Sequence, residues 1–226
     1  MGGVLGIEDA DCDRLLGVRP DPLVCVTDGH DLEAMILRSR ALERVLAELG
    51  DVERIDEFES RGRSVREALL DAVRPLGIAK YLKAQRGLKG LDISSKDLAY
   101  ERFIDPATIA VDFELFCGYM SERCGGCQRP EQIAREIQAV ELYGADDWDV
   151  CRGHDLVGAL TVALSAALGT KRLRVFVVEQ ALRLAFDSLA FARTGVCAGM
   201  LDWQSRQPGF RVLHDDMEAL ATAVRG

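Results

Sequence analysis

The chain has 226 residues, of which 48% are hydrophobic, so it can bury a sizeable core as one large domain or two small ones. Its formal net charge of −9 weighs against binding nucleic acid through charge alone, because phosphate neutralisation needs a basic surface. The longest apolar stretches fall short of a membrane span, and the N-terminus lacks a basic region followed by an apolar one, so we expect a cytoplasmic protein without a membrane partner.

Two short apolar runs near the N-terminus each stop at a cluster of acids. The runs are residues 4–7 and 23–26, and buried parallel strands end in this way when their carboxyl ends carry a polar site. The acids are Asp9, Asp11 and Asp13 after the first run, and Asp28, Asp31 and Glu33 after the second. Carboxylates at this density repel one another unless a cation is present, and oxygen ligands alone suit Mg²⁺ or Mn²⁺ rather than zinc.

The rest of the chain shows mainly helical spacing of its apolar residues. Helices are predicted over residues 30–49, 64–86, 108–123, 130–143, from the 148–155 loop to 168, 175–193, 195–206 and 215–224. Ser64 and Glu67 form a capping box at the start of the second helix, and Pro75 should kink or split it. Residues 87–100 form a polar connection, and 210–213 are a candidate last strand.

These elements define an α/β fold class with a partial parallel sheet at the N-terminus followed by a mainly α-helical region. A boundary between the two parts is expected between about residues 50 and 90. We therefore divide the chain into an α/β portion, residues 1–60, and a mainly helical domain packed on it, residues 61–226.

Asp9 and Asp11 form a DxD motif at the end of the first predicted strand. Residues i and i+2 of an extended segment point to the same side, so both carboxylates can reach one ion or a pair of ions. Two divalent ions about 4 Å apart activate water and stabilise the leaving oxygen in phosphodiester cleavage. Purely structural alternatives exist for the neighbouring acids: Asp28 can cap the following helix, and Glu33 can interact with its dipole. An aspartate nucleophile of the phosphatase kind is less favoured, because no DxxxT/V-like pattern follows.

The segment Arg152-Gly-His-Asp155 is a second unusual cluster, at the predicted start of a helix. Its glycine allows another backbone to come close, and His154 can bind phosphate or transfer a proton. The structural alternative is that Asp155 caps the helix while His154 makes a contact between the helical part and the acidic edge.

Five segments occur in a recognisable order. They are Gly6-Ile-Glu-Asp-Ala-Asp-Cys-Asp13, Thr27-Asp-Gly-His-Asp-Leu-Glu33, Tyr100-Glu-Arg-Phe-Ile-Asp105, Arg152-Gly-His-Asp155 and Leu182-Arg-Leu-Ala-Phe-Asp187. Together they resemble a bacterial family of uncharacterised-domain proteins with a Toprim-like core. Members of that family are similar to the nuclease half of overcoming-lysogenization-defect enzymes, and some serve as the nuclease effector beside an ABC-type ATPase in phage defence.

The resemblance implies a metal-dependent nuclease that cleaves DNA or RNA and works with an ABC-type ATPase. Asp9, Asp11 and Glu33 take the catalytic positions, and the same three residues with Asp28 take the positions of the Mg²⁺ or Mn²⁺ ligands. The resemblance also implies supporting roles for Asp13, His30, Asp31, Arg152, His154 and Asp155.

One element of the Toprim pattern is not in the sequence as given. A Toprim site has a glutamate at the end of a strand upstream of the DxD, and this chain starts at the DxD strand; Glu8 points to the opposite side and is a poor substitute. We therefore keep a second hypothesis, a non-catalytic interaction subunit whose apolar helices over 156–168 and 175–192 form a homo-oligomer or bind a partner ATPase. A two-stranded sheet also leaves an edge that proteins normally cover.

Overall fold

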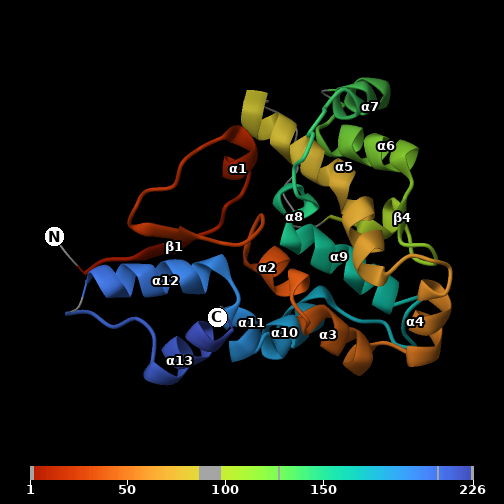
Figure 1. The fold of residues 1–226 in the computed structure, drawn as a ribbon. Coiled ribbons are helices and arrows are strands. Elements are labelled where there is room, and N and C mark those ends of the chain that lie inside the picture. Colours follow the sequence, from red (N-terminus) through yellow and green to blue (C-terminus); the bar gives the residue numbers. More distant parts are fainter. Residues whose placement is uncertain (1–2, 87–97, 127, 208, 225–226) are drawn as a thin grey trace.

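The computed structural model describes residues 3–86, 98–126, 128–207 and 209–224 and is mainly helical, with one small parallel sheet near the N-terminus (Figure 1). Strands β1 (Gly6–Glu8) and β2 (Val24–Val26) pair in parallel, with Gly6 opposite Val24 and Glu8 opposite Val26. The predicted α/β class is confirmed at this coarse level. Its Toprim-like character stays a prediction.

The helices follow the strands along the chain. They are α1 (Asp13–Leu16), α2 (Leu32–Arg38), α3 (Ala41–Leu49), α4 (Val52–Glu59), α5 (Val65–Arg86), α6 (Phe113–Arg123), α7 (Pro130–Gln138), α8 (Asp147–Val150), α9 (Gly153–Leu164), α10 (Val175–Ala185), α11 (Ser188–Ala192), α12 (Gly195–Arg206) and α13 (Asp215–Ala223). A 3₁₀ turn, η1 (Tyr100–Arg102), precedes a short antiparallel pair, β3 (Ile104–Asp105) and β4 (Ala110–Val111).

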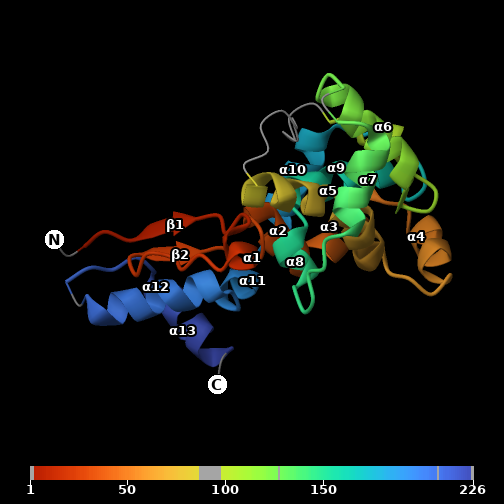
Figure 2. The ribbon, with the colours of Figure 1, turned by 90° about the horizontal axis from the view of Figure 1, so that it is seen from above.

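The parallel sheet and α12 together form an arm that extends from the rest of the molecule (Figure 2). Helix α12 runs along β2, and Gly199 on the helix lies so close to Cys25 on the strand that a side chain at this glycine would meet the sulfur. A small apolar cluster of Cys25, Met35 and Val196 joins the strand, α2 and α12. The C-terminal part of the chain thus covers one face of the N-terminal sheet.

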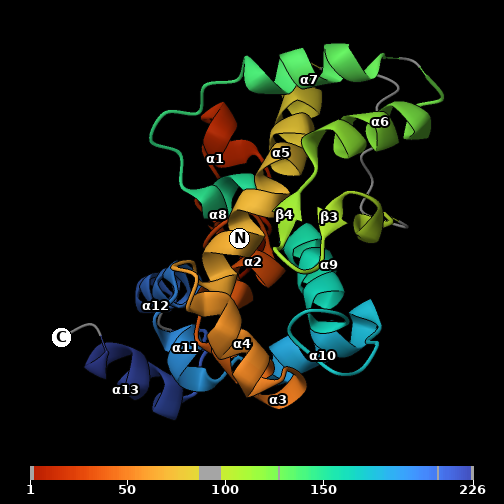
Figure 3. The same ribbon diagram turned by 90° about the vertical axis from the view of Figure 1, so that its right-hand side faces the viewer.

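The main hydrophobic core lies in the helical body, around α5 and α9 (Figure 3). Helix α9 contacts α2, α5 and α10, and its leucines, from Leu156 to Leu164, are buried on all sides. The core joins α2 and α3, which belong to the predicted first portion, to helices of the predicted second portion. The proposed division at residue 60 stays a prediction.

The helix predicted over residues 30–49 is broken into α2 and α3. Ser39 is extended at the break, and its hydroxyl accepts a hydrogen bond from Ala41 N at 3.1 Å. The guanidinium of Arg66 on α5 donates to the carbonyls of Leu37 and Ser39. Those last carbonyls of α2 have no partner within the helix, so a long-range arginine stabilises an end that local spacing did not predict.

Several other predicted boundaries shift. The capping box is confirmed, since Ser64 N donates to the Glu67 carboxylate at 2.9 Å and Glu67 N donates to Ser64 Oγ at 3.2 Å. Helix α5 continues through Pro75 without being split. The helix predicted from residue 108 begins only at Phe113, because 110–111 pair as a strand and Asp112 caps the helix.

The remaining differences lie toward the C-terminus. Helices α7 and α9 end earlier than predicted, and the helix predicted over 175–193 is interrupted at Phe186 and Asp187, where Asp187 caps α11. The described residues of the predicted strand over 210–213 form an irregular segment. Most of the polar connection at 87–100 lies outside the described residues. Among those that are described, no helix is both long and apolar enough to cross a membrane.

Candidate functional site

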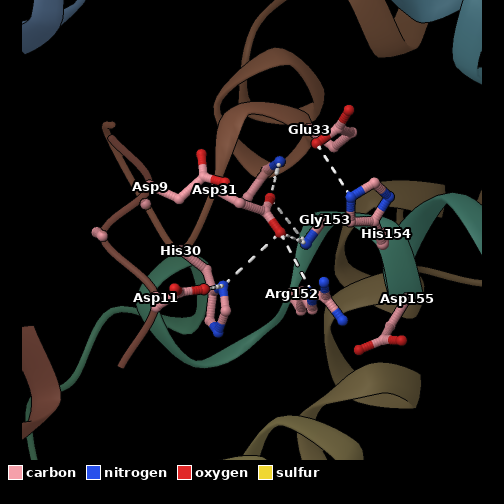
Figure 4. Close-up of polar contacts among 12 residues, drawn as sticks. Asp9, Asp11, His30, Asp31, Glu33, Arg152, Gly153, His154 and Asp155 are labelled. Atoms are coloured by element: carbon pink, nitrogen blue, oxygen red, sulfur yellow. Dashed lines mark hydrogen bonds and ion pairs between the residues drawn. The ribbon is translucent and has the colours of Figure 1, made fainter. Parts of the chain in front are cut away.

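The carboxyl ends of β1 and β2 are tied together by backbone hydrogen bonds. Thr27 N donates to Glu8 O at 3.1 Å, and Ala10 N donates to the Thr27 hydroxyl at 3.1 Å. Asp11 N donates to His30 O at 2.7 Å. Because the strands are parallel, the two acid-rich segments leave the sheet at the same edge, as the sequence predicted. We call this region, built from Asp9, Asp11, His30, Asp31 and Glu33, the acidic edge (Figure 4).

Asp9 lies beside the start of α2, where its Oδ1 accepts a hydrogen bond from Leu32 N at 3.1 Å. Partial burial raises the pKa of Asp9, the negative charge of Asp31 raises it further, and Asp11 and Glu33 add to the effect. The other carboxylates of the acidic edge are therefore close enough to Asp9 to disfavour its ionisation. A bound cation would reverse this effect.

Asp11 is reached through a turn rather than an extended strand. Strand β1 ends at Glu8, and Asp11 has a φ of 44°, in the left-handed region. The prediction that one extended segment carries both Asp9 and Asp11 is therefore wrong, whereas the prediction that both carboxylates reach one ion or a pair of ions stays a prediction. The Asp11 side chain is 72% exposed, and its carboxylate accepts no hydrogen bond from the described residues.

Asp31 is the buried centre of the acidic edge. Its Oδ1 accepts a hydrogen bond from Ala34 N at 2.9 Å, which caps α2, and both carboxylate oxygens lie 3.0 Å from Gly153 N at the start of α9. Burial raises the pKa of Asp31, but the contact with His30 and the bond from Ala34 outweigh it and hold the pKa below its usual range. One carboxylate thus joins two helix N-termini.

Gly153 makes this junction possible. A Cβ at this position would clash with the backbone nitrogen of Ala34 and the carboxylate of Asp31. The close approach predicted from the glycine before His154 is thus confirmed. Arg152 lies beside the junction, with its Nε 3.9 Å from the nearer carboxylate oxygen of Asp31.

Glu33, on the first turn of α2, is buried and paired with residues far along the chain. Its Oε1 accepts a hydrogen bond from Arg183 Nη2 at 2.8 Å, and its Oε2 lies 3.7 Å from His154 Nε2. On its other side the His154 ring is 3.6 Å from a carboxylate oxygen of Glu179. The predicted contact of His154 between the helical part and the acidic edge is therefore present. Arg183 lies in the fifth of the five segments, 182–187, but no role was predicted for it from the sequence. No nearby residue in the sequence indicates that Arg183 pairs with Glu33.

His30 is 3% exposed, and its Nδ1 makes no hydrogen bond to any described residue. This atom lies 3.7 Å from Asp31 Oδ2 and 3.8 Å from Asp11 Oδ1. Burial lowers the pKa of His30, but the contacts with Asp31 and Cys12 outweigh it and raise the pKa to about 9. An imidazolium at neutral pH therefore partly offsets the negative charge of the acidic edge.

Three predicted site residues lie apart from the acidic edge. Asp28 binds Gly195 N at 2.5 Å, so it fixes the start of α12 rather than capping α2 as predicted. A role as metal ligand would require Asp28 to give up this bond. Asp13 opens α1 and is exposed. Asp155 is fully buried against Lys80 and Tyr100 and does not cap α9, so this structural alternative was wrong.

The Asp155 contacts form a separate buried network. Tyr100 OH donates to Asp155 Oδ1 at 2.7 Å, and Lys80 Nζ contacts the other carboxylate oxygen. Burial lowers the pKa of Lys80 although Asp155 opposes the shift, and burial raises the pKa of Tyr100. These three groups satisfy one another between α5, η1 and α9, which is the arrangement expected of a structural network.

Asp9 and Asp11 are the carboxylates of the acidic edge with the fewest hydrogen bonds and ion pairs to described residues. These two carboxylates accept a single hydrogen bond between them from the described residues, so most of their oxygen lone pairs remain available. Mg²⁺ is commonly held by one or two carboxylates, with water and substrate phosphates completing its coordination. Across the described ranges, no group of three or more His, Cys, Asp or Glu side chains is already arranged to hold a metal ion. A third protein ligand would have to move, and Glu33 would have to weaken its contact with Arg183.

Comparison with known proteins gives no assignment: no family model, no curated protein and no solved structure matches the chain. The acidic edge and the resemblance of the five motifs are thus the features that bear on function.

Proposed function

We propose that the chain is a metal-dependent nuclease of the Toprim type, which hydrolyses phosphodiester bonds in DNA or RNA as the effector of an ABC-type ATPase in phage defence. The observation that supports the proposal is that acid-rich segments leave two parallel strands at the same edge, where burial and the charges of Asp31, Asp11 and Glu33 raise the pKa of Asp9. The type of nuclease and the ATPase partner follow from the resemblance.

In this proposal Asp9 and Asp11 hold the metal, since their carboxylates are open to solvent and carry few hydrogen bonds. Bound Mg²⁺ or Mn²⁺ supplies Lewis-acid stabilisation of the phosphate and lowers the pKa of a coordinated water. Glu33 provides the third carboxylate, and its release from Arg183 would let it approach the metal.

Two other groups have assigned roles. Asp31 is a positioning residue, because its carboxylate fixes the N-termini of α2 and α9 and so fixes the backbone from which Asp9 and Glu33 are held. His154 is partly exposed beside Glu33, where it can deliver a proton to a leaving oxygen.

The test is cleavage of DNA and tRNA by the purified chain in the presence of Mn²⁺, alone and with an ABC-type ATPase from the same organism. We expect cleavage that EDTA abolishes and that the double variant Asp9→Ala/Asp11→Ala reduces at least about a hundredfold. The matched control is Glu8→Ala/Asp13→Ala, which removes the same charge from two exposed neighbours and should retain activity. Failure to cleave with or without the ATPase, or equal activity in both double variants, would overturn the proposal.

A second candidate function, a non-catalytic interaction subunit, is favoured by the exposed apolar edge of the sheet. Within the described residues β1 pairs only with β2, and Val4 and Ile7 are 71% and 56% exposed. Two apolar helices were predicted as an interaction surface. The prediction is wrong for α9, because this helix is buried in the core. Helix α10 does expose Phe176 and Leu184.

Light scattering after size-exclusion chromatography distinguishes the two candidates when combined with the cleavage assay. The interaction subunit predicts a stable dimer or a complex with the ATPase that Ile7→Lys disrupts, without any cleavage by the assembled complex. A monomeric chain that does not bind the ATPase would exclude it.

A further inference from the structure

A cleft of about 940 Å³ lies between the arm and the helical body, on a side of α2 lined by Met35 and Arg38 rather than by Glu33. Its walls come from α1, from the junction of α2 and α3, and from the segment joining α10 to α12. Six arginines line it: Arg14, Arg38, Arg40, Arg44, Arg66 and Arg193. Four carboxylates accompany them, so the cleft has an excess of positive charge in a chain whose net charge is −9.

Four of the six arginines are held by other parts of the protein. Arg14 pairs with Asp149 at 2.8 Å, Arg38 with Asp146 at 3.0 Å, Arg44 with Asp187 at 2.6 Å and Arg66 with Glu43 at 2.5 Å. Three of these four, all except Arg38, also donate to backbone carbonyls. These side chains fix the walls of the cleft, and part of their hydrogen-bonding capacity is already used.

Arg40 and Arg193 differ from the other four. Both are exposed, and neither forms an ion pair or a side-chain hydrogen bond with any residue that the structure describes. Arg40 precedes α3 and Arg193 follows α11, so the two come from separate walls of the same cleft. A guanidinium without a carboxylate partner offers a planar set of donors that matches the oxygens of a phosphate group.

The cleft also has apolar surface between its charged groups. Phe186, Leu189 and Ala190 line it, and Phe186 is partly exposed. Sites for single nucleic acid strands combine a positively charged groove with an aromatic side chain that contacts bases. A volume of about 940 Å³ is also within the range of roughly 300–1,000 Å³ typical of sites for small ligands.

We propose that this cleft binds the phosphate of a nucleotide unit through Arg40 and Arg193, with the base against Phe186. The ligand is a nucleic acid strand or a free nucleotide, which present the same phosphorylated nucleoside. Asp28, which follows β2 and lies apart from the acidic edge, lines the same cleft. The choice of a nucleotide as the ligand rests on the proposed nuclease function. The inference that Arg40 and Arg193 are open to a phosphate does not depend on it.

Binding is measured in EDTA, so that it is independent of cleavage. The probes are a fluorescently labelled single-stranded 12-mer, as DNA and as RNA, followed by anisotropy, and unlabelled ATP and AMP followed by calorimetry. The variant is Arg40→Ala/Arg193→Ala. The matched control is Arg172→Ala/Arg174→Ala, which removes two exposed arginines outside the cleft and changes the net charge equally.

We expect the cleft variant to bind the probes at least about tenfold more weakly than the control does. The reason is that each charge-assisted hydrogen bond to the phosphate strengthens binding more than a neutral hydrogen bond does. For the oligonucleotide, the slope of log K against log salt should also become shallower by about 0.7, the contribution of one neutralised phosphate on a single strand. Loss of oligonucleotide binding identifies a strand as the ligand, and loss of ATP or AMP binding alone identifies a free nucleotide.

Absence of binding by every probe, or equal weakening in both double variants, would overturn the proposal. The result is separable from the nuclease test. A chain that binds in EDTA but never cleaves with Mn²⁺ refutes the nuclease and retains the cleft. A chain that cleaves with Mn²⁺ but binds every probe equally well without the two arginines refutes the cleft and retains the nuclease.

Discussion

The acidic edge and the arginine-lined cleft lie near different faces of α2. Both combine charged side chains that bind other parts of the protein with charged side chains that are open to solvent. In each, some of the charged side chains hold helices in place: Asp31 and Glu33 do so at the edge, and Arg44 and Arg66 do so in the cleft. In each, two side chains of one sign stay open, Asp9 with Asp11 and Arg40 with Arg193. The comparison separates charges that stabilise the fold from charges that are available to a ligand.

The largest effect on stability is expected at Asp31. Asp31→Ala removes the cap of α2 and leaves Gly153 N buried without its acceptor, so the free energy of unfolding should fall by about 3 kcal/mol. Urea denaturation measures this change. Asp13→Ala, an exposed acid in the same region, should stay within about 0.5 kcal/mol of wild type. Equal effects of the two variants would mean that Asp31 does not join the two helices.

A pH effect should follow from His30, whose pKa is raised to about 9 from an ordinary value near 6.5. A raised pKa in the folded state gives stability that is complete below about pH 6.5 and is lost as the pH rises through 9, on the order of 2 to 3 kcal/mol. Denaturation in EDTA between pH 6 and 10 measures it. His30→Gln should remove this component and His214→Gln should retain it; the same pH dependence in His30→Gln would contradict the assignment.

Gly153→Ala should cost about 2 kcal/mol, because its Cβ would clash with the backbone of α2 and the Asp31 carboxylate. Gly118 on α6 provides the matched control, since a Cβ there meets no atom within 4 Å. Gly118→Ala should be neutral or stabilising by up to about 1 kcal/mol. Thermal denaturation compares the two variants, and a neutral Gly153→Ala would show that the two helix N-termini are not in close contact.

The smallest effect on stability is expected for the open arginines. Arg40→Ala/Arg193→Ala should change the free energy of unfolding by less than about 0.5 kcal/mol, because neither side chain has a partner among the described residues. The contrasting variant is Arg66→Ala, which removes the donors to the end of α2 and should cost about 2 kcal/mol. Comparable losses in both variants would show that Arg40 and Arg193 also hold the fold together.

Local features were predictable from the sequence. The two strands, the capping box of Ser64 and Glu67, and the close approach at Gly153 each depend on residue types within a few positions of one another. The meeting of the acids at one edge was also predictable, because parallel strands end together.

Long-range partners were not predictable. Arg66, which lies on α5, donates to the backbone at the break in the predicted 30–49 helix. Gly195 N donates to the Asp28 carboxylate, and Arg183 donates to that of Glu33. The six arginines of the cleft are scattered between residues 14 and 193, so they form no charge run in the sequence. Spacing along the chain shows which side chains share a helix face, whereas these contacts depend on how the helices pack.

The central claim is that the two open carboxylates of the acidic edge bind a divalent cation. Titration of Mn²⁺ followed by electron paramagnetic resonance tests it directly, with wild type, Asp9→Ala/Asp11→Ala and the control Glu8→Ala/Asp13→Ala compared at the same ionic strength. We expect wild type and the control to bind Mn²⁺ with similar affinity, and the Asp9/Asp11 variant to lose that binding. Equal Mn²⁺ binding by all three proteins, or none by wild type, would contradict the account.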